Sequence, residues 1–275
     1  MALLGFWMPG GVAISQESYE MSVATFNIRY ANPDDTLRWE DRKDEVANAV
    51  RYFDVIGFQE VLPQQKNDLI ARMPRHAHYG EGRDRDGAGE ACPIFWNQKR
   101  FDFLHGEIRW LSDTPLVAGS IGPGADLPRI VTIVLLHDKK TKQTVRVLNT
   151  HWSHTSEEAR EAASNLMAGW TGWAGEADLT LVCGDFNAEP QSPPISRLLE
   201  SSDLQDTYDN ANFRCRKSFG TYSTFFPTNL MGATRIDAIF YRGNVTVDWV
   251  CADELIKYGV YISDHLPYHA VFKIP

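Results

Sequence analysis

One arrangement occurs twice in this chain: an apolar strand ends in a polar residue, a helix follows, and a second apolar strand ends in a carboxylate. The first copy uses residues 23–27 and 55–60, and the second uses residues 147–151 and 181–185. Two strands joined through a helix usually pair in parallel, so their carboxyl ends meet at one edge of a sheet. The repeat therefore predicts two βαβ halves whose polar strand ends lie along one rim.

Local patterns predict the elements between and around these strands. Apolar residues at helical spacing indicate a helix over residues 39–53, and Pro63 begins a second helix that extends to about residue 73. Residues 155–158, Thr-Ser-Glu-Glu, form a capping-box pattern that predicts a helix to about residue 173. The other predicted elements are a short helix at residues 194–200 and strands at residues 21–30, 92–96, 101–111, 129–137, 144–151, 179–185, 235–241, 245–250 and 268–274.

Composition favours one folded domain. The chain has no Ser/Gly tract, charge block or low-complexity segment, so we predict a single domain over residues 20–275 and an N-terminal extension over residues 1–19. The net charge of −9 argues against a broad basic surface for nucleic acid or anionic membrane. No apolar run is long enough to predict a transmembrane segment. We expect a monomer.

The cysteines do not predict a disulfide framework or a zinc site. Cys92, Cys183, Cys215 and Cys251 lie far apart, and Cys183 falls in an apolar strand where a buried free thiol is expected. The apolar start, residues 1–8, lacks a basic region ahead of it, which does not favour a secretory signal. A cytoplasmic location is therefore slightly favoured, while a secreted or periplasmic location stays open.

Polar side chains gather at the predicted strand ends: Asn27, Glu60, His151, Asp185, Asn187, Asp237, Asp264 and His265. Asp185 and Asn187 are two residues apart, and in extended backbone this spacing points both side chains the same way. The alternative is a turn in which both residues bond their own backbone. Asp237 interrupts an apolar strand and needs a partner, for which a histidine and Arg235 are the alternatives.

These residue types suit phosphoryl transfer. Carboxylates such as Glu60 can hold Mg²⁺ or Mn²⁺, which prefer oxygen ligands. Asp185 can orient or deprotonate a water molecule. His151, and His265 held by Asp237, can stabilise the negative charge that develops on the phosphoryl oxygens.

Six motifs, in their order along the chain, resemble those of the endonuclease/exonuclease/phosphatase superfamily, in a bacterial-type branch of metal-dependent hydrolases. They are Thr25-Phe-Asn-Ile-Arg29, Gly57-Phe-Gln-Glu60, Asn149-Thr-His151, Gly184-Asp-Phe-Asn187, Arg235-Ile-Asp237 and Ser263-Asp-His265. The resemblance covers residues 21–274. It implies the DNase-I-like fold, a four-layer α/β sandwich in which two mixed β-sheets pack face to face with helices outside.

The resemblance also implies roles for individual residues. The implied metal ligands are Glu60, Asp264 and Asn27. The implied catalytic residues are Asp185 and Asn187, which position the water, His151 and His265, which flank the phosphate, Asp237, which orients His265, and Asn27. Two departures from the family pattern are Ser153, where many relatives have aspartate, and Trp96, where many have a tyrosine near the phosphate.

Four residues are candidate substrate contacts: Arg29, Arg129, Trp152 and His154. A structural salt bridge is the alternative for each arginine, and a structural role at the start of a helix is the alternative for His154. Trp152 either forms a wall of the cleft or packs beneath it. The charged loop at residues 80–92 either lines the pocket or is solvated.

The sequence therefore predicts a divalent-metal-dependent hydrolase in which an activated water attacks a phosphate ester in line. The preferred substrate is a phosphodiester, either nucleic acid or a small-molecule or lipid diester. The alternative is a phosphomonoesterase that acts on a phosphorylated sugar or lipid headgroup. A non-catalytic binding protein on the same fold would be expected to have lost part of the polar set, and all eight residues are present.

Overall fold

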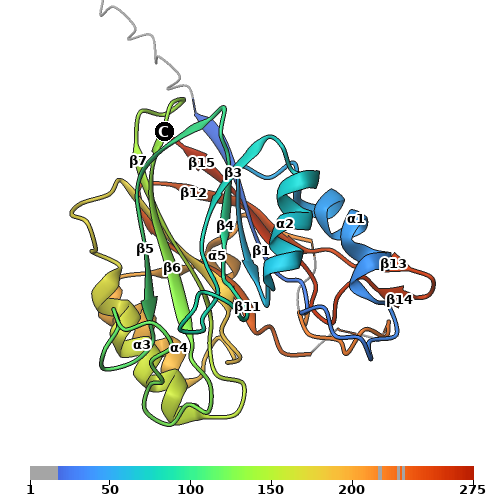
Figure 1. Cartoon of the computed structure of the whole chain (residues 1–275). Helices are drawn as coiled ribbons and strands as arrows, with labels where there is room; N and C mark the ends of the chain where they lie inside the picture. The colour runs from blue at the N-terminus through green and yellow to red at the C-terminus, as the bar shows by residue number, and fades with distance from the viewer. Residues whose placement is uncertain (1–17, 216–218, 228–229, 231–232) are drawn as a thin grey trace, which may run out of the picture.

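Two large β-sheets form the centre of the computed structural model, which describes residues 18–215, 219–227, 230 and 233–275 (Figure 1). In spatial order, the first sheet contains β10 (Phe213–Arg214), β12 (Thr246–Ala252), β15 (Tyr268–Ile274), β1 (Tyr19–Asn27), β2 (Val55–Gln59), β4 (Ile94–Asn97) and β3 (His76–Tyr79). The second contains β5 (Phe101–Trp110), β6 (Ile130–Asp138), β7 (Thr144–His151), β8 (Leu179–Asp185), β11 (Asp237–Gly243) and β9 (Gln205–Asp206). A separate hairpin consists of β13 (Ile256–Lys257) and β14 (Val260–Tyr261).

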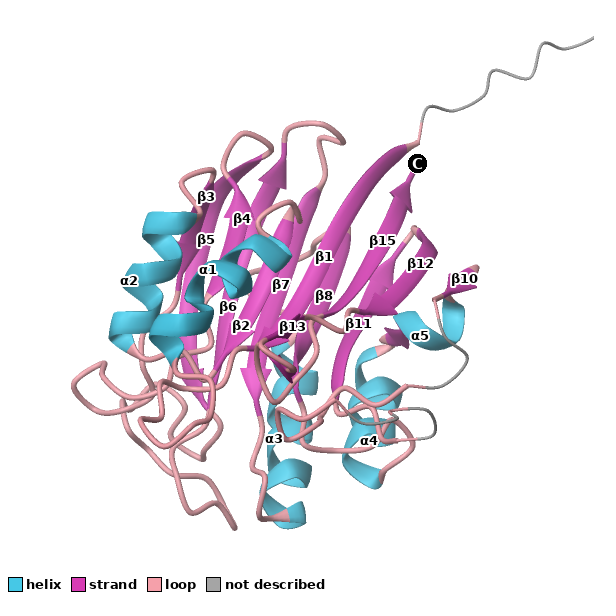
Figure 2. Ribbon diagram, turned by 90° about the vertical axis from the view of Figure 1, so that its right-hand side faces the viewer, coloured by secondary structure: helices cyan, strands magenta, loops and turns pink. Residues whose placement is uncertain are grey.

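Helices cover the outer face of each sheet, which gives four layers. The helices are α1 (Trp39–Val50), α2 (Pro63–Arg72), α3 (Glu157–Trp170), α4 (Pro193–Ser202) and the short α5 (Thr207–Asn210). Figure 2 shows α1 and α2 in front of the strands, and their apolar residues pack with those of β1 and β2. Residues of α3 and α4 pack against β6, β7, β8 and β11, and a third apolar cluster fills the space between the sheets. The predicted fold class is confirmed.

The two predicted βαβ halves are present. β1 pairs in parallel with β2, so that Asn27 lies beside Gln59, and β7 pairs in parallel with β8, so that His151 lies beside Asp185. Each half lies in a different sheet. Because the sheets face each other, the four strand ends lie along one rim, as the repeat predicted.

A buried polar network joins the two sheets just beneath this rim. Asn149 on β7 donates through Nδ2 to the carbonyl oxygens of Phe58 (2.8 Å) and Pro93 (3.0 Å), and its Oδ1 accepts from Gln59 Nε2 at 2.6 Å. Gly57 allows this close approach, because a Cβ there would lie 2.7 Å from the Asn149 Oδ1. The Gln and Asn of two family motifs thus fix the spacing of the sheets below the site.

The N-cap of α3 and the pairing of two cysteines differ from the sequence predictions or add to them, whereas the state of Cys183 agrees with its prediction. The N-cap of α3 is Ser156, whose hydroxyl accepts from the backbone N–H of Ala159, and not the first residue of the capping-box pattern. Cys183 is a buried free thiol as predicted, whereas Cys215 and Cys251 form a disulfide between the end of β10 and β12. That pairing depends on the side-by-side packing of the two strands, which local sequence does not reveal.

Two further predictions concern the ends of the chain and the membrane. Residues 1–17 of the predicted N-terminal extension lie outside the described residues. Among the described helices, none has the length and apolar character needed to cross a membrane.

Candidate active site

Three strands that reach the rim are followed by residues with left-handed backbone. Arg29 follows β1 with φ 56°, Glu60 follows β2 with φ 60°, and Asn187 follows β8 with φ 47°. This conformation is uncommon for residues other than glycine and is often found at functional sites. Each strand therefore turns sharply where its last polar side chains point into the space between the sheets.

Asp185 lies at the centre of the site and is buried. Its Oδ2 accepts from Asn27 Nδ2 at 2.9 Å and lies 3.4 Å from His151 Nε2 and 3.5 Å from His265 Nε2. The hydroxyl of Ser263 donates to the backbone oxygen of Asn27 at 2.8 Å and so holds the loop before β15 against β1. The structure thus brings together side chains from β1, β7, β8 and that loop, which are far apart in sequence.

The Asp185/Asn187 pair makes the predicted turn interaction, and both residues also line the site. The backbone N–H of Asn187 donates to Asp185 Oδ1 at 3.0 Å, which is the turn interaction, while Oδ2 faces the other site residues. The Asn187 side chain lines the site but donates through Nδ2 to the backbone oxygen of Trp152 at 3.1 Å. The left-handed backbone of Asn187 means that this residue lies outside the extended strand from which the shared direction was predicted.

Asp237 pairs with His265, which decides between the two partners considered for it. Its Oδ2 accepts from His265 Nδ1 at 2.8 Å, which leaves the Nε2 atom of this histidine toward Asp185. Arg235 instead pairs with Asp206 on β9. Asp237 and Asp185 are directly opposite on β11 and β8, so the antiparallel register places both carboxylates beside the same imidazole.

The protonation states of the two histidines differ. Burial alone would lower the pKa of His265, but Asp237 and Asp185 raise it well above its usual value, so this ring is an imidazolium. Burial and then the charge of Arg129 lower the pKa of His151 well below its usual value, so His151 is neutral. Burial raises the pKa of Asp185 to about 7, and Asp237 acts in the same direction.

Glu60 and Asp264 form an acidic corner of the site. Glu60 accepts from Asn27 Nδ2 and from the backbone N–H of Tyr30, each at 3.0 Å. Burial raises the pKa of Asp264, and the charge of Glu60 adds to the rise, although Arg29 lies 3.9 Å from the Asp264 carboxylate. A divalent cation would relieve this repulsion, and the oxygen donors fit Mg²⁺ or Mn²⁺.

A second group of possible metal ligands is Asp185, Asp237 and His265, whose ligand atoms lie within 4.8 Å of one another. Two of these residues are already joined by the His265–Asp237 hydrogen bond, so binding a cation there would break it. The other such group among the described residues is Cys251, Asp253 and His269, in which the Cys251 sulfur is already in a disulfide. A metal position at Glu60, Asp264 and Asn27 stays a prediction.

A cavity of about 570 Å³ opens onto these residues. Arg29 lies over the Tyr30 ring at 4.5 Å, and Tyr222 lies against His265. Arg83 and Glu90, which also line the cavity, form a two-bonded ion pair. The charged loop at residues 80–92 thus contributes to the cavity wall, as one of its two interpretations predicted.

The four candidate substrate contacts have different positions. Arg29 lines the cavity but is paired with Asp35 at 3.2 Å. Trp152 is fully buried against Phe186 and lies beneath the cavity, so its predicted contact with substrate is not supported. Trp96 is also buried, in the core between the sheets.

Arg129 and His154 line the cavity as a bonded pair. Arg129 donates through Nη2 to His154 Nδ1 at 3.0 Å, and its side chain is only 6% exposed. Its Nε and Nη1 have no hydrogen-bond partner among the residues that the structure describes. This is a buried cation with free donors at the wall of the site.

Sequence reasoning missed Tyr30, Leu127, Tyr222 and Ile236, which also line the cavity. Tyr30 follows a recognised motif residue directly, which is a usable signal. Tyr222 lies in an irregular loop, and no periodicity or spacing distinguishes it from an ordinary exposed tyrosine.

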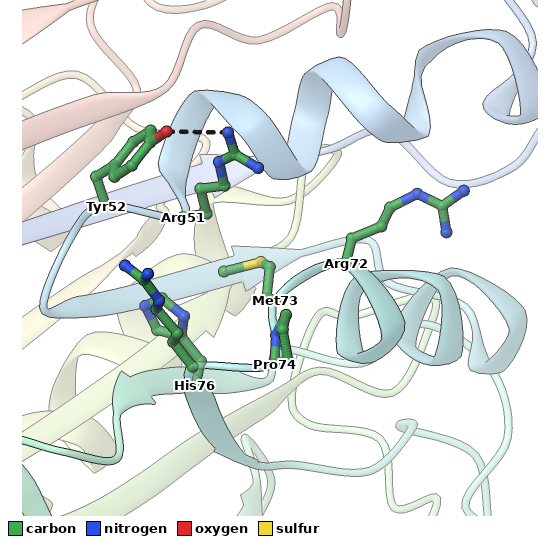
Figure 3. A pocket seen from close by; sticks show the side chains of 7 residues that line it. Arg51, Tyr52, Arg72, Met73, Pro74 and His76 are labelled. Carbon is green, nitrogen blue, oxygen red and sulfur yellow. Dashed lines mark hydrogen bonds between the residues drawn. The ribbon is translucent and has the colours of Figure 1, made fainter.

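A separate cavity of about 300 Å³ lies at the opposite end of β2, beside the carboxyl ends of α1 and α2 (Figure 3). Arg51 donates to the hydroxyl of Tyr52, and Arg72 pairs with Asp44 and Asp68. Cations near the carboxyl end of a helix interact favourably with the helix dipole and so stabilise the helix. These arginines therefore have a structural explanation, and the rim cavity is the candidate active site.

The face-to-face sheets and the acid, amide and histidine groups at their rim define a class of phosphoesterases. The chain belongs to the Endonuclease/Exonuclease/phosphatase family, whose sequence pattern it matches over residues 24–265. This family consists of enzymes that are generally dependent on divalent metal ions.

Solved structures of similar proteins agree with this assignment. An endonuclease/exonuclease/phosphatase family protein from Bacteroides thetaiotaomicron is 27% identical to this chain, with a TM-score of 0.87. The match covers 94% of this chain and 100% of that protein's chain. The corresponding protein from Bacteroides vulgatus is 31% identical with a TM-score of 0.86 and the same coverage. A mannosyl-6-phosphatase from Bacteroides thetaiotaomicron is 28% identical with a TM-score of 0.83, and covers 92% of this chain and 99% of its own.

Among curated proteins, a putative neutral sphingomyelinase from Drosophila melanogaster is 26% identical over 90% of this chain and 57% of its own length. A probable RNA exonuclease from Saccharomyces cerevisiae is 23% identical over 68% of this chain and 41% of its own. The chain spans about half the length of these curated relatives.

Proposed function

We propose that this protein hydrolyses a phosphate ester by in-line attack of a water molecule that Asp185 orients. The observation that carries the proposal is the convergence on Asp185 Oδ2 of Asn27 (2.9 Å), His151 (3.4 Å) and His265 (3.5 Å). A carboxylate flanked by an amide, a neutral imidazole and an imidazolium can take a proton from water while the neighbouring groups bind phosphoryl oxygens.

Each group has a specific task in this proposal. Asp185 accepts the proton of the attacking water, and the Asn187 backbone N–H holds the other carboxylate oxygen in place. His265, charged and oriented by Asp237, donates through Nε2 to a phosphoryl oxygen. His151 donates a second hydrogen bond. Glu60, Asp264 and Asn27 would hold Mg²⁺ or Mn²⁺, which supplies positive charge to a phosphoryl oxygen and to the leaving oxygen.

One observation favours a phosphomonoester over the phosphodiester that the sequence suggested. Three equatorial oxygens carry the charge in the transition state, and in a monoester all three are free of organic groups. The acidic corner, the histidines and Arg129 offer three separate positions for them. In a diester one of these oxygens is substituted, so one fewer acceptor is left for the buried N–H groups of Arg129, which have no partner among the described residues. The hydrogen bond that is then not made would contribute about 1.5–3 kcal/mol.

Relatives with known names support testing both ester types. One similar solved structure is named a phosphatase, and one curated relative is named a putative sphingomyelinase. The test is a panel assayed with Mg²⁺ or Mn²⁺: p-nitrophenyl phosphate and sugar phosphates as monoesters; bis-p-nitrophenyl phosphate, sphingomyelin, phosphoinositides, single- and double-stranded DNA and RNA as diesters.

We expect turnover of monoesters with kcat/KM at least about tenfold above that of any diester, a difference of about 1.4 kcal/mol. Chelation by EDTA should abolish turnover, and added Mg²⁺ or Mn²⁺ should restore it. A higher kcat/KM on a diester would reverse the choice of substrate. No turnover of any ester with either ion would favour the non-catalytic binding protein.

A further inference from the structure

We propose that Tyr222 is a specificity-determining residue whose ring binds the flat face of a cyclic group on the phosphate ester. This inference rests on the proposed function and extends it to the organic half of the substrate. The shared chemistry is a ring that presents C–H groups or π electrons to an aromatic face, as the ring of a sugar phosphate or of a nucleotide does.

The segment that carries Tyr222 is held firmly across the mouth of the site. Tyr222 forms an antiparallel bridge with His265. The backbone N–H of Leu266 donates to the oxygen of Thr221, and that of Ser223 donates to the oxygen of Asp264, each at 2.7 Å. These bonds fix the backbone on both sides of Tyr222 to the loop that carries the imidazolium.

Two left-handed residues then turn the segment away from the site. Thr224 and Phe225 have φ of 56° and 71°, a costly conformation for residues with side chains. Phe225 is buried, and its backbone oxygen accepts from the N–H of Tyr261 at 2.7 Å. The burial and the hydrogen bond of Phe225 therefore hold the chain three residues after Tyr222.

The Tyr222 ring itself is available to a ligand. Its side chain is 46% exposed although it lines the cavity, and its centroid lies 5.1 Å from that of His265 at an interplanar angle of 61°. The ring therefore covers the imidazole with only part of its surface. An aromatic face beside the group that binds the phosphoryl oxygens is in position to contact the first ring attached to the phosphate.

Other residues that line the cavity carry the matching polar groups. The Arg83–Glu90 ion pair and the exposed His154 are planar groups that can donate to or accept from hydroxyl groups or the edges of a base. An acyclic polyol can use these polar groups but offers no flat face to Tyr222. The Tyr222 ring and these polar groups together favour a cyclic substituent over an open chain.

The test compares the wild type with Tyr222→Ala and Tyr222→Phe on three monoesters: glucose 6-phosphate, adenosine 5′-monophosphate and the acyclic glycerol 3-phosphate. We expect Tyr222→Ala to lower kcat/KM on one or both cyclic substrates about tenfold, mainly through KM, as loss of a stacking contact predicts. Glycerol 3-phosphate should change less than about twofold, and Tyr222→Phe should behave like the wild type. The cyclic substrate whose kcat/KM falls more in Tyr222→Ala identifies the kind of ring that Tyr222 contacts.

Phe226→Ala is the matched control, because Phe226 lies on the same segment, is 54% exposed and is not a cavity-lining residue. An equal loss of kcat on all three substrates would show that Tyr222 only positions His265, and would overturn the inference. Calorimetric binding of the same compounds with Mg²⁺ to the wild type and Tyr222→Ala separates this inference from the proposed function. Equal Kd values in the two proteins overturn the inference even if no ester is hydrolysed.

Discussion

Two buried clusters of charge occupy different parts of the sandwich, and they differ in how fully they are hydrogen-bonded. Away from the rim, Arg100 donates to both oxygens of Asp138 at 3.1 Å or less, to Asp54 at 2.8 Å and to the backbone oxygen of Glu20. At the rim, Arg129 has two free nitrogens, and Asp237 Oδ1 has no partner among the described residues.

The difference distinguishes a structural cluster from a functional one. A buried charge is stable only when its donors and acceptors are used, and the Arg100 cluster uses them within the protein. The rim cluster leaves several of them without a partner among the described residues, beside the cavity in which we propose that the phosphate ester and a cation bind. Substitutions in the first should therefore affect stability, and substitutions in the second should affect turnover.

The largest effect is expected for Asp185→Asn. The amide cannot take a proton from water, so kcat should fall about 10³-fold or more. The melting temperature should stay the same or rise, because a buried carboxylate that is shared by two histidines is removed. Initial rates with Mg²⁺ and a thermal melt check both parts.

The control is Asp203→Asn, the same change at the left-handed end of α4, where asparagine also tolerates the backbone. It should leave kcat unchanged. Retention of more than about a tenth of wild-type kcat by Asp185→Asn would exclude Asp185 as the general base.

Arg100→Met should have the second-largest effect, and on stability alone. It leaves the buried Asp138 and the half-buried Asp54 without their arginine partner, which should lower the free energy of unfolding by about 3–5 kcal/mol. Urea unfolding measures this loss. Below the transition, kcat per folded molecule should match the wild type.

Lys139→Met is the comparison for Arg100→Met, because its partner Asp102 is largely exposed. It should cost less than about 1 kcal/mol. Similar losses of unfolding free energy in the two variants would mean that burial of the Arg100 cluster adds nothing to stability.

Arg129→Met should reduce turnover with little effect on folding. Loss of a charged contact to a phosphoryl oxygen should lower kcat/KM on monoesters about 100-fold, whereas diesters should change less than about tenfold. The thermal melt should not fall, because the lost cation had unused donors.

Arg85→Met is the control for Arg129→Met, because it removes an exposed arginine from the neighbouring loop. It should leave kcat/KM unchanged on both monoesters and diesters. An equal fall on monoesters and diesters in Arg129→Met would remove the argument for a monoester. A large fall in melting temperature would place Arg129 with the structural cluster.

The smallest effect is a pH dependence in the structural cluster. Burial would raise the pKa of Asp138, but Arg100 and the N–H of Lys140 lower it below its usual value. A lowered folded-state pKa contributes stability that is present above the unfolded pKa, about 4, and is lost as pH falls toward the folded value.

Urea unfolding of the wild type and Asp138→Asn from pH 6 to pH 3 checks this sign. The wild type should be the more stable at pH 6, and the difference in unfolding free energy between the two proteins should narrow as pH falls. A gap that stays constant over this range would show that ionisation of Asp138 is not linked to folding.

Much of the architecture could be predicted because it depends on patterns of residues that are close together in the sequence. Apolar runs of strand length and helices with one apolar face predicted the two βαβ halves, and parallel pairing then required Asn27, Glu60, His151 and Asp185 to share one rim. The motif order extended this to the fold class. The short strands β3, β9 and β10, the short helix α5 and the hairpin β13–β14 were missed, because elements of two to four residues carry too little periodicity.

By itself, the sequence determined which residues end the strands and what chemistry they carry, since these depend on neighbours along the chain. Only the tertiary structure decided that Asp237 pairs with His265 while Arg235 pairs with Asp206, and that Trp152 is buried beneath the cavity. It also decided that Arg129 keeps free donors and that Tyr222 lies on His265. The reason is physical: partners so far apart in sequence are selected by how two sheets and their loops pack, and many pairings satisfy the same local pattern.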